Sequence, residues 1–408
     1  MNILRGQKIK SIIGDIAINM VATILPVLMM QFIFLPIVAQ KYDDSNYGLA
    51  LTLISLITLS AQSFSVSLSN TRLLMNTKYI ESKTVGDFNV LLIVSCIINV
   101  VFLSVGTYLY EGYLNLFNIS LIVMISVIQL VRRYLLVAFR LDIYYKGILF
   151  SNLMLIAGNL IGLVLFLVTG LWQLIFLCGE AISLIYVIYK TNLLKEPIKI
   201  TGLFKRTTKH GIVLLLAAFL GAVNTQIDRL FLYPILGPKM VAVYYVSTLF
   251  GKTLSMAAAP INNVILTYLS KMKKLKLSYF KLMIITASAL GVLSYAFIII
   301  ISEPILKVLY PTYAEEALKL IYITTLTAMI TMLSTVINPV IMKFCNILWQ
   351  IWLNVVNIVI FLLLAFYLIS LYEIWGFVYA ALIAAITKLI LMICVYFKKS
   401  KEVTDGVM

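Results

Sequence analysis

The chain has 408 residues, of which 62% are hydrophobic, and its mean hydropathy is +1.04. A soluble domain contains about 45–50% apolar residues, so this composition excludes an ordinary soluble protein. The 32 Lys and Arg outnumber the 16 Asp and Glu and give a net charge of +16. These cations occupy short segments beside apolar stretches, where anionic lipid headgroups lie. No soluble basic domain remains that could bind nucleic acid.

Twelve long apolar stretches follow one another along the chain. Most contain about 20 residues or more, enough at about 1.5 Å per residue to cross the hydrocarbon core of a bilayer. The first carries Asp15 and Asn19 and is too long for a signal peptide, which predicts an uncleaved first helix. The sequence therefore predicts an all-α integral membrane protein. Its predicted helices are 12–39, 47–70, 88–110, 114–139, 148–168, 171–189, 211–236, 241–270, 279–301, 317–340, 347–370 and 374–397.

The distribution of basic residues predicts the topology. With the N-terminus in the cytoplasm, 23 of the 32 Lys and Arg lie in cytoplasmic segments and five within predicted helices. The remaining four lie outside, and they are Lys41, Lys239, Lys307 and Lys319. This is the positive-inside pattern, and it predicts that both termini are cytoplasmic and that the number of helices is even.

A basic polar segment divides the chain into two halves. Residues 190–210 contain six Lys and Arg and only one acid, Glu196, and six predicted helices stand on each side of this cytoplasmic linker. Because six is even, both halves enter the membrane in the same direction, which indicates two parallel six-helix lobes at 1–189 and 211–408. The external connections are predicted to be short, and the longest is Ser302 to Glu316.

Ionisable side chains at membrane depth are costly and are therefore candidates for function. The candidate substrate-binding cations are Arg132, Arg133, Arg229, Lys252 and Lys388, and the acids that could couple an ion or form ion pairs are Glu180, Asp228 and Asp15. Glu180 lies at a depth that allows a pair with Arg132 or Arg133 if their helices pack together. The alternative for Arg132, Arg133 and Lys388 is to extend their charged ends to the interface, and Asp15 could itself be interfacial.

The surplus of cations indicates the charge of a ligand. A hydrated cavity lined by these groups would attract an anion, and Arg in particular suits the oxygens of a phosphate or diphosphate. Polar residues recur at helical spacing beside the cations, as in Ser126, Gln129 and Arg133. Hydrogen bonding between packed helices explains the same pattern equally well. Pro26 and Pro260, inside predicted helices, permit bending.

The sequence lacks the motifs of soluble enzymes. It has a single histidine, His210, and no Walker loop, Gly-x-Ser-x-Gly or Cys-x-x-Cys motif. Three of its four cysteines lie in predicted helices, and none is placed for an external disulfide or a metal cluster. We therefore predict a transporter that is not an enzyme, with no cofactor and no metal, driven by a gradient, the membrane potential or the concentration of its substrate.

Several short motifs occur in the order and spacing of a known family. They are Asn46-Tyr47-Gly48, Ala138-Phe139-Arg140, Asp228-Arg229-Leu230, Leu236-Gly237, Val243-Tyr244-Tyr245, Ile374-Trp375-Gly376 and Ala380-Ala381. With its twelve predicted helices, the chain resembles the O-antigen and polysaccharide translocases, which are flippases of the MOP (multidrug/oligosaccharidyl-lipid/polysaccharide) exporter superfamily. Val378 and Tyr379 depart from the pattern, because smaller residues are expected there.

The resemblance implies a MOP-type transporter fold in the bacterial inner (cytoplasmic) membrane, with two six-helix lobes around a central cavity. It implies that a lipid-linked oligosaccharide of the undecaprenyl-diphosphate type crosses from the cytoplasmic to the periplasmic leaflet by alternating access. The diphosphate would contact Arg229, Lys252 and Arg133. Membrane lipids, a polysaccharide polymerase and a chain-length regulator are the expected partners, and no nucleic acid is expected.

Two other functions fit parts of the sequence. A MATE-like antiporter of drugs or metabolites would share the fold, but its cationic substrates require carboxylates in the cavity, where cations are in surplus here. A polysaccharide polymerase would also be polytopic, but it requires a sizeable external catalytic loop, and the predicted external loops are short.

Overall fold

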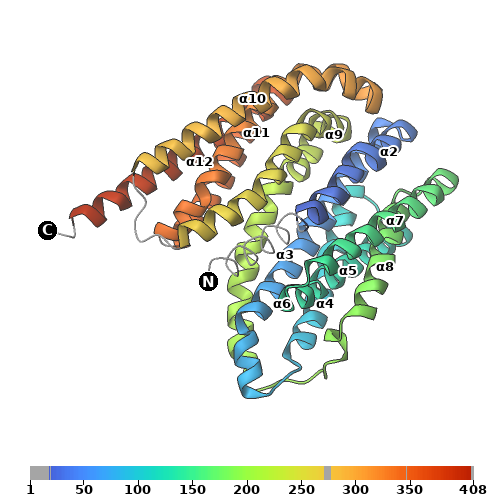
Figure 1. Cartoon of the computed structure of the whole chain (residues 1–408). Coiled ribbons are helices and arrows are strands. Elements are labelled where there is room, and N and C mark those ends of the chain that lie inside the picture. Colours follow the sequence, from blue (N-terminus) through green and yellow to red (C-terminus); the bar gives the residue numbers. More distant parts are fainter. Residues whose placement is uncertain (1–17, 19, 271–276, 346, 406–408) are drawn as a thin grey trace. The chain divides into compact units, whose positions relative to one another are not determined.

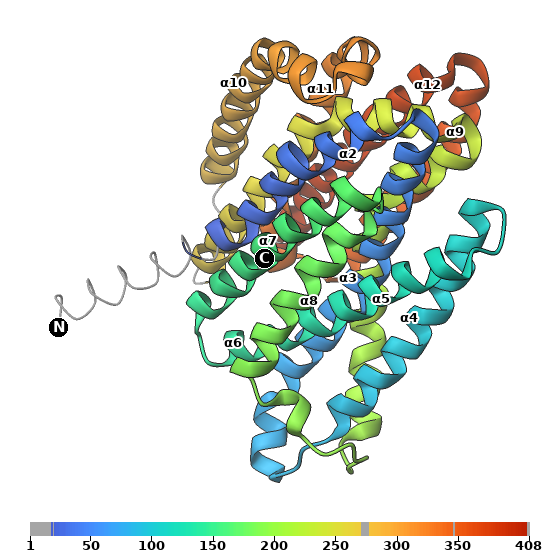
Figure 2. The same cartoon turned by 90° about the vertical axis from the view of Figure 1, so that its right-hand side faces the viewer.

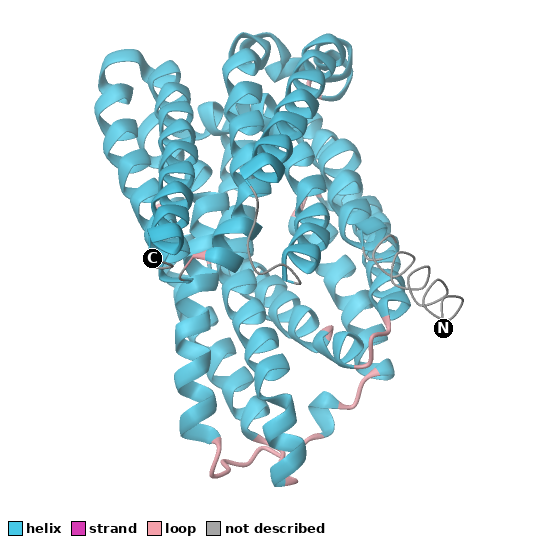
Figure 3. Cartoon of the chain, turned by 60° about the vertical axis from the view of Figure 1, so that its left-hand side comes forward, coloured by secondary structure: helices cyan, strands magenta, loops and turns pink. Residues whose placement is uncertain are grey.

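The computed structural model describes residues 18, 20–270, 277–345 and 347–405 (Figure 1). Helices make up nearly all of this part of the chain, and it contains no strand (Figure 3). Asp15 lies outside the described residues. The elements are η1 Met30–Phe34, α2 Leu35–Lys41, α3 Asp44–Ser82, α4 Asp87–Glu111, α5 Leu116–Leu135, α6 Val137–Leu141, α7 Tyr145–Thr169, α8 Gln173–Lys190, η2 Leu193–Lys195, α9 Phe204–Ser270, α10 Leu277–Leu309, α11 Pro311–Phe344 and α12 Ile347–Asp405.

The number of membrane-spanning segments follows from two breaks in the longest helices. Ten helices among the described residues are long and apolar enough to cross a membrane. In α9, Gly237 has φ 81° and ψ 173°, a backbone conformation that favours glycine, and in α12, Glu373 has φ 51° and ψ −128°. Division of α9 and α12 at these residues turns ten spans into twelve, the number predicted from hydropathy. The chain is a multi-pass membrane protein.

The break at Glu373 makes α12 a helical hairpin. The Phe361 and Phe377 rings lie edge to face with their centroids 5.4 Å apart, although 16 positions separate them. Farther from the break, Lys388 Nζ donates a hydrogen bond to Asn354 Oδ1 at 3.0 Å. As the residue before the break moves back from 361 to 354, its partner after the break moves forward from 377 to 388, so the two halves of α12 run antiparallel.

The chain forms two compact units. The first contains the described residues up to Val38 together with Ser45–Ile235, and the second contains Ala39–Asp44 and the chain from Leu236 onward. Residues 190–210 and the first half of α9 therefore belong to the first unit. The predicted division into lobes at 1–189 and 211–408 concerns helices around a common cavity, and it stays a prediction.

Several predicted element ends are wrong, and two cases have different reasons. The second predicted helix stops at residue 70, whereas α3 continues to Ser82, because hydropathy marks the apolar core while the helix continues through polar residues that also favour helix. The predicted external connection from Ser302 to Glu316 is almost entirely helical. Helix α10 continues to Leu309 and α11 starts at Pro311, a residue suited to the first turn of a helix.

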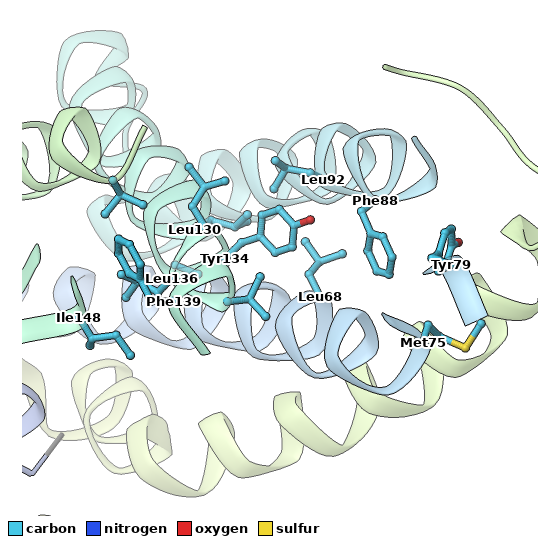
Figure 4. Close-up of a cluster of buried hydrophobic side chains, with 14 of the residues drawn as sticks. Leu68, Met75, Tyr79, Phe88, Leu92, Leu130, Tyr134, Leu136, Phe139 and Ile148 are labelled. Carbon is cyan, nitrogen blue, oxygen red and sulfur yellow. The ribbon is translucent and has the colours of Figure 1, made fainter. Parts of the chain in front are cut away.

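Each unit has its own apolar core. In the first unit, side chains of α3, α4, α5, α6 and α7 meet in one buried cluster (Figure 4). Its members drawn with labels are Leu68, Met75, Tyr79, Phe88, Leu92, Leu130, Tyr134, Leu136, Phe139 and Ile148. In the second unit, α9, α10, α11 and α12 contribute to a core in which the Phe280 and Tyr396 rings stack with centroids 3.9 Å apart.

Helices α7 and α8 approach each other backbone to backbone (Figure 2). Gly158 and Gly162 lie four residues apart on the face of α7 that meets α8. A Cβ atom at Gly158 would lie 2.5 Å from the Cys178 carbonyl oxygen and 2.7 Å from the Gly179 Cα. Small residues at this spacing let membrane helices pack closely where no hydrophobic effect drives them together. The α7–α8 pair therefore depends on the absence of side chains at these two positions.

We expect Gly158→Leu to destabilise the first unit by about 1–3 kcal/mol, because the new side chain overpacks the α7–α8 contact. The matched control is Gly221→Ala in the first half of α9, where a Cβ would meet nothing within 4 Å. That control should be neutral or slightly stabilising, since Ala favours helix more than Gly does. Thermal unfolding of the purified protein in detergent measures both changes, and equal melting temperatures would contradict the close approach.

Candidate functional site

A buried ion pair joins α5 to α8 inside the first unit. The Arg132 and Glu180 side chains are each 4% exposed, and the Arg132 Nε atom donates to Glu180 Oε2. Arg132 Nη2 donates to Glu180 Oε1 at 3.2 Å, and Gln129 Nε2 donates to the same oxygen at 3.1 Å. Both carboxylate oxygens are thus occupied. Of the two arginines within reach of Glu180, the structure selects Arg132.

Arg133, the next residue along α5, has a different environment. Arg133 is half-buried, and among the described residues no hydrogen bond or ion pair holds its guanidinium. Successive residues of a helix point about 100° apart, so the partner of Arg132 lies on another face. Arg133 still experiences the charges of Glu180 and Arg132. It is a partly buried cation whose N–H groups form no hydrogen bond with the described residues.

A proline in the first helix connects to this ion pair. Pro26 has no N–H, so the carbonyl oxygen of Ala22, four residues earlier, lacks its usual helical partner. Asn152 of α7 supplies the missing donor, with Nδ2 2.7 Å from the Ala22 oxygen. The same side chain accepts a bond from Arg132 Nη1 at 3.4 Å. One hydrogen-bonded chain therefore runs from the first helix through Asn152 to the Arg132–Glu180 pair.

Asp228 and Arg229 are both buried in the first half of α9, and each is 9% exposed. Arg229 Nη1 donates to Ser55 Oγ of α3 at 3.1 Å, and its backbone N–H donates to Asp228 Oδ1 at 3.0 Å. Arg229 thus helps to fix α9 against α3, and both residues bring charge into the interior.

The remaining candidate cations belong to the second unit. Lys388 is half-buried and donates to Asn354, and Lys252 is half-buried in the second half of α9. The predicted cavity that combines Arg229, Lys252 and Arg133 includes residues of both units, and it stays a prediction.

Sequence reasoning missed a second buried ion pair. Arg72 follows the predicted helix 47–70 on its cytoplasmic side, but it is 8% exposed and donates from Nη1 to Glu196 Oε2 at 3.1 Å and from Nη2 to Glu196 Oε1. The Tyr134 hydroxyl lies 2.9 Å from Nη1, and the guanidinium carbon lies 4.9 Å from the centre of the Phe88 ring. The one available signal was that Glu196 is the single acid of a basic segment.

The segment around Glu196 is docked along the ends of α3 and α4. The Asp87 carboxylate accepts bonds from the Thr201 backbone N–H at 2.7 Å and from the Thr201 hydroxyl at 2.6 Å. Asn89 Nδ2 donates to the carbonyl oxygens of Leu193 at 3.2 Å and of Glu196 at 2.7 Å. Residues 191–203 therefore follow a defined path over the first unit.

We expect Glu180→Gln to destabilise the protein by about 3–5 kcal/mol, because it leaves the buried Arg132 charge without a counterion. The double variant Arg132→Met, Glu180→Leu should recover most of that loss, since an apolar pair of similar volume removes both charges. The control is Glu303→Gln, whose partner Lys307 is 62% exposed, and it should leave the melting temperature unchanged. Additive losses in the double variant would show that the two residues do not act as a pair.

Asn152→Ala should destabilise the first unit by about 1–3 kcal/mol, because the Ala22 carbonyl then lacks a donor. Pro26→Ala restores a backbone N–H at that carbonyl. In the double variant, therefore, the Asn152 substitution should be better tolerated than it is alone. Thermal unfolding of the four proteins gives the coupling energy, and a value of zero would show that Asn152 does not replace the bond removed by Pro26.

Comparison with known proteins gives a fold. No protein-family model matches the chain, and no curated protein matches it. Among solved structures, lipid II flippase MurJ in an inward closed conformation is similar with a TM-score of 0.71 at 14% identity, over 94% of this chain and 89% of MurJ. An outward-facing multidrug resistance MATE family transporter of the MOP superfamily is similar with a TM-score of 0.63 at 11% identity, over 96% of each chain.

A third structure, the eukaryotic MATE transporter AtDTX14, is similar with a TM-score of 0.62 at 12% identity, over 97% of this chain and 98% of that one. All three similarities extend over nearly the whole chain at low sequence identity, so they concern the fold. The protein therefore has the fold of the MOP-type transporters, as the sequence predicted.

Proposed function

We propose that the protein is a flippase that moves a polyprenyl-diphosphate-linked oligosaccharide, an O-antigen or related surface polysaccharide repeat unit, from the cytoplasmic to the periplasmic leaflet. The observation that carries the proposal is Arg133, a half-buried cation whose guanidinium forms no hydrogen bond or ion pair with the described residues. A membrane protein holds such a group where an anion or water can reach it. The planar guanidinium fits the oxygens of a phosphate.

The pairing of the acids supports an anionic substrate. A transporter of cations needs a carboxylate that can exchange partners with its substrate. Glu180 already accepts bonds from Arg132 and Gln129 through both oxygens, and Asp228 accepts a bond from the Arg229 backbone. A MATE-like antiporter of cationic drugs shares the fold but finds less support in these contacts.

The membrane potential would assist this direction of transport. A diphosphate diester carries roughly two negative charges, and each charge that leaves a negative interior gains about 2.3 kcal/mol per 100 mV. The gain applies when the protein cations stay in place. The bonds of Arg229 to α3 and of Arg132 to α8 within the first unit support this condition. Proton coupling through Glu180 or Asp228 is the alternative source of energy.

The proposal includes a route and partners. Arg133, Arg229 and Lys252 would contact the diphosphate in turn, while the prenyl chain stays in lipid and the sugars cross a hydrated cavity. Both termini would be cytoplasmic in a bacterial inner membrane. A polysaccharide polymerase and a chain-length regulator would use the unit after it has crossed.

The test is a bacterial strain that lacks its own copy of this gene and receives the wild type, Arg133→Gln or the control Lys319→Gln. Lys319 is an exposed cation paired with Glu315. We expect lipid-linked units to accumulate on the cytoplasmic leaflet with Arg133→Gln, with transport about 10- to 100-fold slower, because one charge-assisted hydrogen bond is lost. The leaflet is determined by labelling the units in intact and in opened cells, at matched protein levels.

Other outcomes have defined meanings. Normal export with Arg133→Gln and also with the double variant Arg229→Ala, Lys252→Ala would refute the assignment of these cations. Units that reach the periplasm unpolymerised in the deletion strain would indicate a polymerase. An unchanged glycan with altered resistance to cationic drugs would indicate an antiporter.

A further inference from the structure

The Arg72 guanidinium has the geometry of an anion site. Its two Nη atoms donate to both oxygens of the Glu196 carboxylate, Nη1 also donates to the Tyr134 hydroxyl, and the guanidinium carbon lies 4.9 Å from the centre of the Phe88 ring. Bidentate pairing of this kind fits two oxygens of a phosphate as well as those of a carboxylate. The Arg72 guanidinium contacts α4, α5 and the segment 191–203, so its orientation is fixed before a ligand binds.

A cavity opens beside this pair. It has a volume of about 370 Å³, and its lining includes Arg72 and Glu196 together with Asn76, Lys83 and Thr84. The lining therefore offers a second cation, an amide and a hydroxyl near the Arg72 guanidinium. The Nε atom of Arg72 is buried and has no hydrogen-bond partner among the described residues, so one donor of the guanidinium remains unused.

The Glu196 side chain is not needed to dock its own segment. Asn89 holds the backbone at Leu193 and Glu196, and Asp87 holds it at Thr201, through bonds that do not involve the Glu196 carboxylate. The carboxylate can therefore leave Arg72 by side-chain rotation while the segment stays in place. The neighbouring Lys195 and Lys199 are exposed and offer a displaced carboxylate other cations.

We infer that Arg72 forms an anion-binding site that Glu196 occupies in this structure, and that a phosphate or diphosphate group entering from the cavity takes the place of the Glu196 carboxylate. The inference rests on the proposed function and deepens it, because it gives the diphosphate a first contact. That contact lies where α3 ends and α4 begins, the side predicted to be cytoplasmic. The Glu196 carboxylate then acts as an internal competitor of the ligand.

The experiment measures binding of inorganic pyrophosphate to the purified full-length protein in detergent, by calorimetry and by thermal unfolding. Glu196→Gln removes the competing charge and keeps the size of the side chain, so pyrophosphate should bind at least 10-fold more tightly than to the wild type. It should also raise the melting temperature of this variant in a saturable way, which sodium chloride of equal ionic strength should not. The double variant Arg72→Gln, Glu196→Gln should lose both effects.

Two further variants keep the result interpretable. Glu196→Asp retains the charge but shortens the side chain, and it should bind pyrophosphate with an affinity between those of the wild type and Glu196→Gln, which covers the case in which Glu196→Gln does not fold. Glu315→Gln removes an exposed acid of α11 and should bind pyrophosphate as the wild type does. Equal affinity in the wild type, Glu196→Asp and Glu196→Gln would overturn the inference, and so would binding that survives the loss of Arg72.

The source of the phosphate group is resolved by a second arm. The same variants are placed in nanodiscs with or without phosphatidylglycerol and titrated with pyrophosphate. Competition by the lipid that depends on Arg72 would assign the site to headgroups, and its absence would assign it to the diphosphate of a substrate. Because this experiment measures binding without transport, its failure leaves the proposed flippase activity untouched. Loss of the activity in cells would likewise leave the binding result in place.

Discussion

The structure depends on one constraint, which is that lipid offers no water to satisfy a polar group. A charge or an unpaired carbonyl inside the membrane must therefore find a partner within the protein. The first unit meets this requirement with the pair of Arg132 and Glu180 and with the Asn152 amide at the carbonyl that Pro26 leaves open. These contacts join helices that are distant in sequence, so the contacts that satisfy the polar groups also hold the helices together.

The same constraint makes the charge of Arg133 important. A paired Arg132 contributes little net potential, because Glu180 cancels it at short range. Arg133, beside it, has no such partner among the described residues, and its field acts in a medium of low polarisability where charges interact strongly. Arg133 thus adds a positive charge that no ion pair with the described residues offsets, whereas much of the overall charge of +16 lies in segments beside the helix ends.

Hydropathy was enough to predict the twelve membrane-spanning helices, since apolar segments follow directly from the solvent in which they lie, whereas the MOP-type fold was expected from the family resemblance. The ends of helices that extend beyond the apolar core were harder to predict, because a helix such as α3 continues through polar residues that favour helix. The prediction of an external connection from Ser302 to Glu316 was wrong for a related reason. This segment contains Pro304 and Pro311, but Pro311 begins α11 and Pro304 lies within α10.

The charged residues of the candidate site could be predicted from the sequence, but which of them pair with one another could not. Sequence places Arg132 and Arg133 at the same depth, and only the rotation of α5 against α8 decides which of them meets Glu180. Arg72 was assigned to a polar cytoplasmic end, yet it is buried because residues 191–203 cover it and carry Glu196 to it. Both cases show that a charge acquires its role from the surface that packs over it. A cation on a membrane helix is thus assigned to structure or to ligand binding by its partner, which only the tertiary fold reveals.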